Sequence, residues 1–183
     1  MGELDEFRQQ FESVKRDGIE LTATLDDGQF NWRPLPRQWS ISECLAHLNV
    51  VDGLDLPLLA EAIERSRMAG LLGQGPFRYG WLSRKFVSLS ESPARLKMRA
   101  PKEYLPPSGQ PKEEVVAEFR SIHDRMLELV AQSDGLDLAR IKVRTPFPVL
   151  KFSLGQRFAL LAAHDRRHLL QAWAVRKHPS FPV

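Results

Sequence analysis

Two histidines near the C-terminal end of the chain have a spacing that suits metal binding. His164 and His168 lie four residues apart in the proline-free run LLAAHDRRHLLQ, which covers residues 160–171. On a helix, side chains at this spacing lie on one face with Cβ atoms about 5–6 Å apart. Two imidazoles so placed can bind one metal ion. A catalytic metal site commonly takes three protein ligands and leaves a position open, so a third ligand is expected elsewhere in the chain.

A buried histidine pair without a metal is the alternative. Each imidazole has a donor and an acceptor to satisfy, so two of them on an apolar helix stripe fill a core at a cost. The spacing therefore favours metal binding. The HExxH motif of zinc proteases does not explain the pair, because Asp165 stands in place of its glutamate and no glutamate follows Glu128.

The elements that must position this pair are predicted to be helices. Apolar residues recur at three- and four-residue steps in the segments 4–25, 41–68, 111–132 and 154–177. The connection between the second and third of these segments is long. These features predict an all-α protein, a four-helix bundle in which a long crossover links helices two and three, so that these two helices run parallel.

Local signals mark where the predicted helices begin and where they are weak. The pairs Ser40–Glu43 and Ser153–Gln156 have the spacing of capping boxes and predict the starts of helices two and four. The sequence Asp26-Asp27-Gly28 predicts the end of helix one. Gly18 weakens that helix, and Pro57 predicts a kink or a break near residues 54–57 of helix two.

The connections carry fewer signals. Residues 70–110 are rich in glycine and proline and predict at most one short helix, around Tyr79–Leu89. Residues 71–102 hold seven Lys or Arg against Glu91 alone, interleaved with aromatic residues, a pattern that could contact nucleic acid or an acidic ligand. A solvated loop neutralised by the acidic helices is the favoured alternative. Residues 136–152 predict a loop with one short extended stretch.

Length and composition set the class of protein. With 183 residues, the chain is expected to form one domain over residues 1–183 that buries a core without disulfides. The net charge of +3 indicates no polyanionic partner. Cys44 is the single cysteine, and neither a membrane-spanning run nor a secretory leader is recognised, so we expect a soluble, cytoplasmic protein with no membrane partner.

Several polar residues near the predicted site have two interpretations. A lone histidine such as His47 on an apolar stripe is more often a hydrogen-bonded core residue than a ligand. Glu43 and Gln171 lie one turn from His47 and His168 and could accept a hydrogen bond from a ligand, although capping is the stronger interpretation of Glu43.

Proton-transfer groups are harder to assign. Asp52 and Asp165 are candidates, but solvated or salt-bridged carboxylates are favoured. Arg167 fits an anionic substrate or an ion pair equally well. Cys44 is expected to be a small buried hydrophobe rather than a metal neighbour, and His123 a residue on the flank of the bundle.

The order and spacing of these parts resemble those of the DinB/YfiT-like superfamily. Helix two begins with Trp39, Ser40, Glu43 and His47, and helix four carries the pattern Ala-His-Asp-x-x-His-x-x-Gln from Ala163 to Gln171. The similarity spans essentially the whole chain and includes Arg120, His123 and Asp124. The resemblance implies that His47, His164 and His168 bind one divalent metal ion in a four-helix bundle.

The resemblance leaves the reaction open. Members of that superfamily include S-transferases and isomerases that use low-molecular-weight thiols, and others classed as metal-dependent hydrolases, so the fold does not fix the activity. We therefore expect a metal-dependent hydrolase or thiol transferase acting on a small molecule, with Zn, Ni, Fe or Mn as the ion and the catalytic residues unknown. A non-catalytic metal-binding or stress-response protein is the alternative, and nucleic-acid binding is a weaker one. Relatives often dimerise, so a homodimer is possible.

Overall fold

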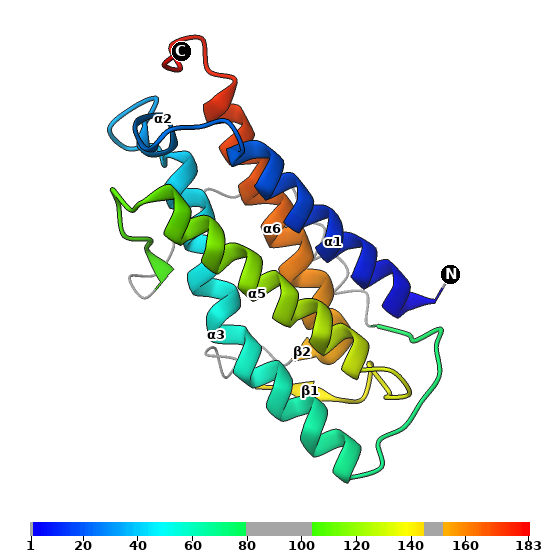
Figure 1. The fold of residues 1–183 in the computed structure, drawn as a ribbon. Coiled ribbons are helices and arrows are strands. Elements are labelled where there is room, and N and C mark those ends of the chain that lie inside the picture. The colour runs from blue at the N-terminus through cyan, green and yellow to red at the C-terminus, as the bar shows by residue number, and fades with distance from the viewer. Residues whose placement is uncertain (1, 80–103, 145–151) are drawn as a thin grey trace.

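The computed structural model describes residues 2–79, 104–144 and 152–183 (Figure 1). These ranges are mostly helical and include a small two-stranded sheet, so the all-α prediction is confirmed at that level. The described elements are α1 (Glu3–Thr22), α2 (Asp27–Asn31), α3 (Ile41–Met68), α5 (Lys112–Gln132), β1 (Lys142–Val143), β2 (Phe152–Ser153) and α6 (Leu154–Arg176).

The four long helices α1, α3, α5 and α6 pack side by side (Figure 1). At the contacts between α1 and α6, the residue numbers increase in the same direction along both helices. Arg166 donates to Gln10 Oε1 at 2.8 Å, and Trp173 Nε1 donates to Asp17 Oδ1 at 2.8 Å. These two helices are therefore parallel.

Helices α3 and α5 are also parallel to each other and antiparallel to the other pair. Asn49 on α3 donates to the Val115 carbonyl near the start of α5, and Arg67 donates to the Gln132 carbonyl at its end. Consecutive long helices that run in the same direction need a crossover connection. The antiparallel arrangement of α3 and α6 brings the first half of α3 beside the middle of α6.

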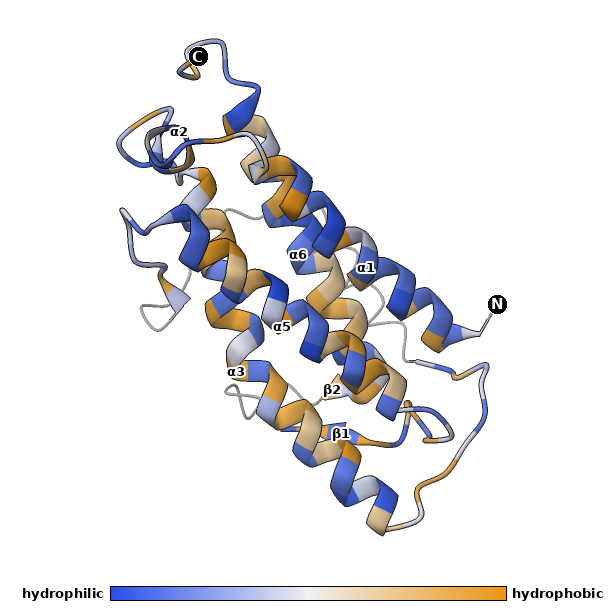
Figure 2. Ribbon diagram, in the orientation of Figure 1, coloured by the Kyte–Doolittle hydropathy of each residue, from blue (hydrophilic) through white to orange (hydrophobic). Residues whose placement is uncertain are grey.

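Apolar side chains fill the space between these helices, whereas the outward face of α1 is mostly hydrophilic (Figure 2). Phe11 and Phe158 are fully buried and pack edge to face, with ring centroids 6.3 Å apart. Full burial of one such side chain stabilises the fold by about 1.5–3 kcal/mol. The core thus fixes the relative positions of α1, α3, α5 and α6.

Gly18 does not interrupt α1, because close packing explains its presence. A Cβ atom at this position would lie 2.5 Å from Cε1 of Phe119 on α5. Phe119 is fully buried, so it has little room to move. The glycine lets α5 approach α1, and this packing outweighs the weak helix propensity of glycine.

Of the kink or break predicted near Leu54–Pro57, the break is wrong, since α3 is one continuous helix from Ile41 to Met68. Proline lacks the N–H that would complete one hydrogen bond of the helix. Asp55 and Leu59, on either side of Pro57, are both buried against the neighbouring helices. Tertiary packing therefore holds both halves of α3 in a single helix.

The predicted end of helix one is also wrong. Helix α1 ends at Thr22, and Asp26 instead caps the short helix α2. Asp26 Oδ1 accepts from the Gln29 N–H at 2.7 Å, while Gln29 Oε1 accepts from the Asp26 N–H at 3.1 Å. An aspartate followed three residues later by glutamine is a start signal as well, and this interpretation of the sequence was missed.

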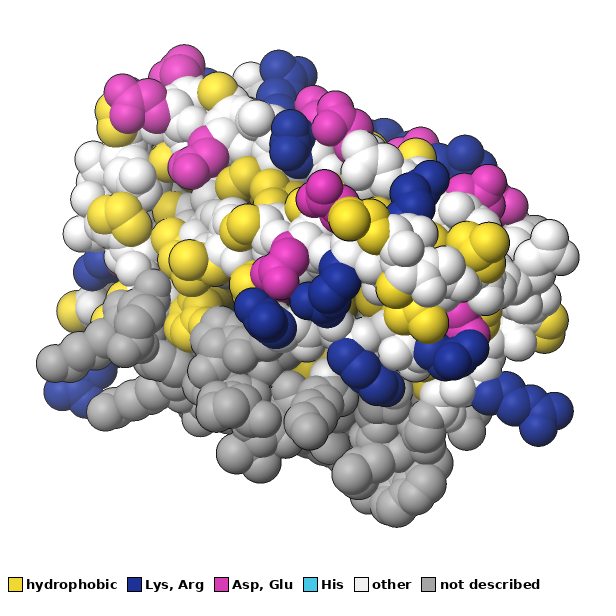
Figure 3. All heavy atoms as spheres, turned by 90° about the horizontal axis from the view of Figure 1, so that it is seen from below, with side chains coloured by type: hydrophobic (Ala, Val, Ile, Leu, Met, Phe, Trp, Pro, Cys, Tyr) yellow, Lys and Arg dark blue, Asp and Glu magenta, His cyan; other side chains and the backbone are white. Residues whose placement is uncertain are grey.

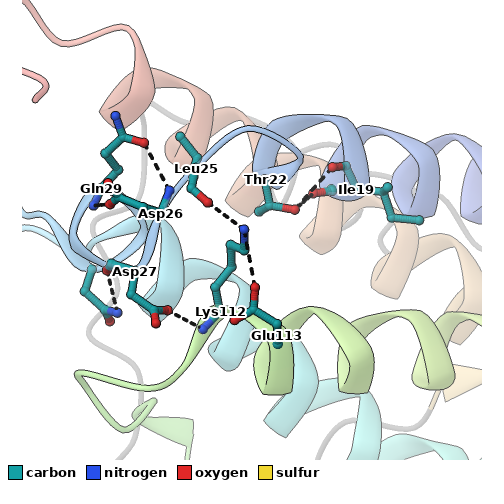
Figure 4. A network of polar contacts seen from close by, with 10 residues as sticks. Ile19, Thr22, Leu25, Asp26, Asp27, Gln29, Lys112 and Glu113 are labelled. Carbon is teal, nitrogen blue, oxygen red and sulfur yellow. Dashed lines mark hydrogen bonds and ion pairs between the residues drawn. The ribbon is translucent and has the colours of Figure 1, made fainter. Parts of the chain in front are cut away.

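Polar contacts join α2 to the beginning of α5 (Figure 4). Asp27 Oδ1 accepts from the Lys112 N–H at 2.7 Å, and the Lys112 ammonium donates to the Leu25 carbonyl. One free N–H at the start of α5 is thereby satisfied. Pro111 lies just before α5 and serves as its N-cap residue.

The capping box predicted for helix two forms in full, whereas only the Gln156 half of the pair predicted for helix four forms. Ser40 Oγ accepts from the Glu43 N–H at 3.1 Å, and a Glu43 carboxylate oxygen accepts from the Ser40 N–H at 3.0 Å. Gln156 Oε1 accepts from the Ser153 N–H at 2.9 Å. The predicted extended stretch corresponds to β1, which pairs antiparallel with β2. The predicted helix at Tyr79–Leu89 and most of the basic connection lie outside the described residues.

The surface seen from below carries interspersed acidic and basic side chains with scattered apolar ones (Figure 3). Among the helices that the structure describes, none combines the length and the apolar character needed to cross a bilayer.

Candidate metal centre

Helices α3 and α6 bring three histidines together. One ring nitrogen each of His47, His164 and His168 lies within 4.8 Å of the others. His47 Nε2 and His164 Nε2 are 3.3 Å apart. Two nitrogen ligands about 2.0–2.1 Å from a tetrahedral ion are separated by roughly 3.3–3.4 Å. The spacing of this pair therefore fits a shared metal ion, and the three residues form a cluster that could hold one.

A backbone carbonyl sets the orientation of the His47 ring. His47 Nδ1 lies 2.7 Å from the Tyr104 carbonyl oxygen. A carbonyl only accepts hydrogen bonds, so Nδ1 carries the hydrogen and Nε2 presents its lone pair to the cluster. This is the arrangement that holds a ligating imidazole in place in metal sites.

Burial keeps two of the rings neutral at pH 7. It lowers the pKa of His47 to about 4, although the Tyr104 carbonyl acts in the opposite direction. It lowers the pKa of His168 to about 2, assisted by electrostatic repulsion between a charged His168 and its neighbours His164, His47 and Arg167. Removal from water penalises the charged imidazolium in both cases. Neutral rings have a lone pair available for a metal.

An aromatic wall borders the cluster. The Trp39 ring stacks on His168 with centroids 5.6 Å apart and planes at 29°, and it lies 4.9 Å from the His47 ring. The side chain of His164 is 24% exposed, whereas the whole residue His47 is only 4% exposed. Solvent therefore reaches the cluster at His164. From the sequence, Trp39 is expected only at the start of a helix, because nothing in its spacing predicts a ring contact across to α6.

Two residues considered as hydrogen-bond partners of the ligands do not take that role. Glu43 caps α3 and forms an ion pair with Arg33, whose Nε donates to it at 2.7 Å. The capping interpretation of Glu43 is thus confirmed. Among the described residues, none makes a hydrogen bond to His168 Nδ1, so Gln171 does not hold that ring.

Cys44 is a buried apolar residue, as expected. It is fully enclosed in the core cluster that includes Ile41 and Leu45. Burial raises the pKa of its thiol, and the nearby Glu43 carboxylate adds to this effect. A thiol in such surroundings is a poor source of thiolate.

The structure corrects the expectations that Asp52 and Asp165 are solvated and that His123 lies on the flank, whereas the salt-bridged alternative for Asp165 fits its two histidine neighbours. None of them is solvated or on the flank of the helices: their exposed fractions are 1%, 0% and 1%. Ligand-type atoms of these three residues lie within 4.8 Å of one another, and we call them the carboxylate cluster. The error has a physical origin, since α6 buries more than one of its faces and Asp165 lies on the second one.

Asp165 connects the carboxylate cluster to the three histidines. Its Oδ1 lies 3.7 Å from His164 Nδ1, and its Oδ2 lies 3.6 Å from His123 Nε2. Burial alone would raise the pKa of Asp165, but its interaction with the neighbouring His123 and His164 rings keeps it below its usual value. Burial and then the charge of Asp165 raise the pKa of Asp52 well above its usual value.

A buried ion pair borders this region. Arg157 Nε donates to Asp55 Oδ1 at 2.9 Å, and its Nη2 donates to the other carboxylate oxygen. The side chains of Asp55 and Arg157 are 4% and 13% exposed. The two-pronged geometry is the strong form of a carboxylate–guanidinium contact.

Comparison with known protein families gives a match that covers most of the chain. The family model described as the DinB superfamily matches residues 10–172, which include all three histidines and the carboxylate cluster. No curated protein matches the chain.

Proposed function

Because the chain belongs to the DinB superfamily and brings His47, His164 and His168 together, we propose that it is a metal-dependent enzyme acting on a small molecule. It is either a hydrolase or an S-transferase that uses a low-molecular-weight thiol. The observation that carries the proposal is the convergence of three imidazole nitrogens, two of them 3.3 Å apart. In this proposal, the chain is a single four-helix bundle domain, with a long crossover between α3 and α5, that works in the cytoplasm.

The protein's own residues bind and orient the reactants. His47, His164 and His168 hold a divalent ion, and the Tyr104 carbonyl keeps His47 Nε2 turned toward it. Zn, Ni and Fe suit imidazole ligands, and Mn, which prefers oxygen ligands, suits them less. When bound, such an ion supplies a positive charge that makes a water molecule or a thiol more acidic. Trp39 closes one side of the site and offers an apolar wall to a substrate.

The state of Cys44 indicates where the sulfur for an S-transfer would come from. Its thiol is fully buried, and its raised pKa keeps it protonated. It therefore serves neither as a nucleophile nor as a ligand. An S-transfer at this site needs a thiol from a small molecule, which makes such a thiol the expected partner.

A non-catalytic metal-binding protein is the second candidate. It is favoured by the positions of the nearest buried carboxylates. Asp165 faces His164 Nδ1, the nitrogen on the other side of the ring from Nε2, and Glu43 is engaged in capping. Neither is placed as a general base on the side of the cluster where His47 and His164 meet. Nucleic-acid binding depends on a basic segment that lies mostly outside the described residues, and it remains the weakest option.

Metal content tests the proposal directly. We expect purified protein to contain about one divalent ion per chain by elemental analysis, and His47→Ala and His168→Ala to lose it because each removes one of three ligands. His178→Ala is the matched control: its Nδ1 accepts from the Ser180 N–H, far from the cluster. Absence of a stoichiometric ion in the wild type, or equal retention in all variants, would contradict the proposal.

Turnover separates the two candidates. The metal-loaded protein is assayed with low-molecular-weight thiols plus electrophiles, and with esters and amides. Activity that disappears in His47→Ala and persists in His178→Ala supports the enzyme. Retained metal without turnover of any of these substrates supports the binding protein.

A further inference from the structure

The carboxylate cluster lies directly behind His164, and the proposed function does not use it. Asp52 comes from α3, His123 from α5 and Asp165 from α6, so three helices converge on it. Among the described residues, none makes a hydrogen bond to either oxygen of Asp52 or Asp165, or to His123 Nε2, within ordinary distance limits. Buried polar atoms without partners are costly, so this group has a role that offsets its cost.

The hydrogen on His123 can be located. His123 Nδ1 lies 2.9 Å from the Phe119 carbonyl oxygen, which only accepts, so Nδ1 carries a hydrogen. Its Nε2 lies 3.6 Å from Asp165 Oδ2, so the ring packs against the carboxylate of Asp165 from the side of α5.

Asp52 holds the same carboxylate from another side. Its own carboxyl is fully enclosed, and burial beside Asp165 favours the neutral acid. A neutral carboxylic acid has one O–H to donate, and an oxygen of Asp165 lies within 4.8 Å of an oxygen of Asp52. Contacts from α3 and α5 thus fix a side chain of α6.

The oxygen of Asp165 that faces the metal centre determines the state of His164. Its Oδ1 lies 3.7 Å from His164 Nδ1, so a small adjustment forms an N–H to carboxylate hydrogen bond. A hydrogen on Nδ1 leaves the lone pair on Nε2, which points toward His47 Nε2. If the hydrogen were on Nε2, that nitrogen could not bind a metal.

We propose that Asp165 is the positioning residue of the metal centre: it holds the hydrogen of His164 on Nδ1 and so presents Nε2 to the ion, while His123 and Asp52 hold Asp165. The inference rests on the proposed function for its metal. The competing interpretation is that Asp52, His123 and Asp165 bind a second ion themselves.

The first test needs no metal. Histidine side-chain nitrogen NMR on metal-free wild-type protein reports which ring nitrogen carries the hydrogen. We expect His164 to carry one on Nδ1, with the low-field shift of a strong hydrogen bond, and this signal to move or vanish in Asp165→Asn. A bare Nδ1 in the wild type overturns the proposal even if the variant does not fold, as does an unchanged signal in a folded variant.

The second test measures metal affinity. Asp165→Asn should bind the divalent ion roughly 10–100-fold more weakly, as expected when a ligating histidine loses its outer carboxylate. Asp124→Asn removes a neighbouring exposed carboxylate that pairs with Lys15, and it should retain wild-type affinity. Equal affinity of wild type and Asp165→Asn overturns the positioning role.

Asp52 variants separate positioning from a second metal site. Asp52→Ala should weaken binding of the single ion, and Asp52→Asn should restore most of the affinity because an amide also donates a hydrogen bond to Asp165. Two ions per wild-type chain, falling to one in Asp52→Asn, would overturn the proposal in favour of a second site. A wild-type chain that binds no metal but has hydrogen-bearing Nδ1 on His164 would defeat the proposed function and leave the orientation of His164 intact.

Discussion

The three-histidine cluster and the carboxylate cluster lie on opposite sides of the His164 ring and contain residue types found in metal sites. The two clusters differ in their exposure to solvent and in the positions of the hydrogens on their polar side chains. The histidine cluster is partly open at His164, and the Tyr104 carbonyl takes the hydrogen of His47 away from its centre. The carboxylate cluster is enclosed, with no member more than 1% exposed.

This difference separates a binding site from a supporting one. Closeness of ligand-type atoms is common to both clusters, so distance alone does not distinguish them. What differs is that the histidine cluster is partly open to solvent at His164 and that the Tyr104 carbonyl leaves His47 Nε2 facing His164 Nε2. In the carboxylate cluster, hydrogen bonds among its own members can satisfy the acceptor atoms. The comparison predicts that substitutions on the enclosed side cost stability first, whereas those on the open side cost metal binding first.

The largest stability effect is expected at the ion pair beside the enclosed cluster. Arg157→Met leaves the carboxylate of Asp55 buried without its partner, and we expect the free energy of unfolding to fall by about 3–5 kcal/mol. Urea unfolding measures this change. Arg65→Met, which breaks an exposed pair with Glu61, should cost about 0–1 kcal/mol. Similar losses in the two variants would remove the claim that the enclosed side carries stability.

A smaller loss is expected for Gly18→Ala. The added methyl group collides with Phe119, whose carbonyl accepts from His123, so the packing around the carboxylate cluster must shift. We expect a loss of about 1–3 kcal/mol in the free energy of unfolding. Gly53→Ala is the matched control, because its Cβ would meet Ile122 at an ordinary 3.8 Å. Alanine there should stabilise α3 by up to about 1 kcal/mol, and thermal melts giving the same sign for both variants would contradict the packing argument.

The smallest effect is expected for Cys44→Ala. Loss of one buried sulfur should lower the free energy of unfolding by about 1 kcal/mol. Metal affinity, measured by competition with a chromophoric chelator, should match that of the wild type because the sulfur is not part of the histidine cluster. A clear drop in metal affinity would show that Cys44 contributes to the histidine cluster, contrary to this prediction.

Periodicity and capping chemistry were enough to predict much of the fold. The apolar repeats predicted all four long helices, and Ser40 with Glu43 placed the start of α3 correctly. The four-residue spacing of His164 and His168 also predicted that they share a face of α6. These features are local, so the chain itself carries the information needed.

The failures involve partners distant in the sequence. Asp165 follows His164 directly and points elsewhere around the helix, toward a region that is buried only because α3 and α5 cover it. No local pattern states which second face of a helix will be covered. Gly18 is a similar case, since its reason is the ring of Phe119 on another helix. Metal binding by the three histidines stays a prediction until the ion is measured.

The anchor of His47 is a main-chain atom, and this has a consequence for divergence within the family. Replacing Tyr104 by another amino acid changes the side chain but leaves the peptide carbonyl in place. The residue at this position can therefore vary without removing the acceptor that orients the ring. Selection on the side chain at position 104 is, to that extent, decoupled from selection for the orientation of His47.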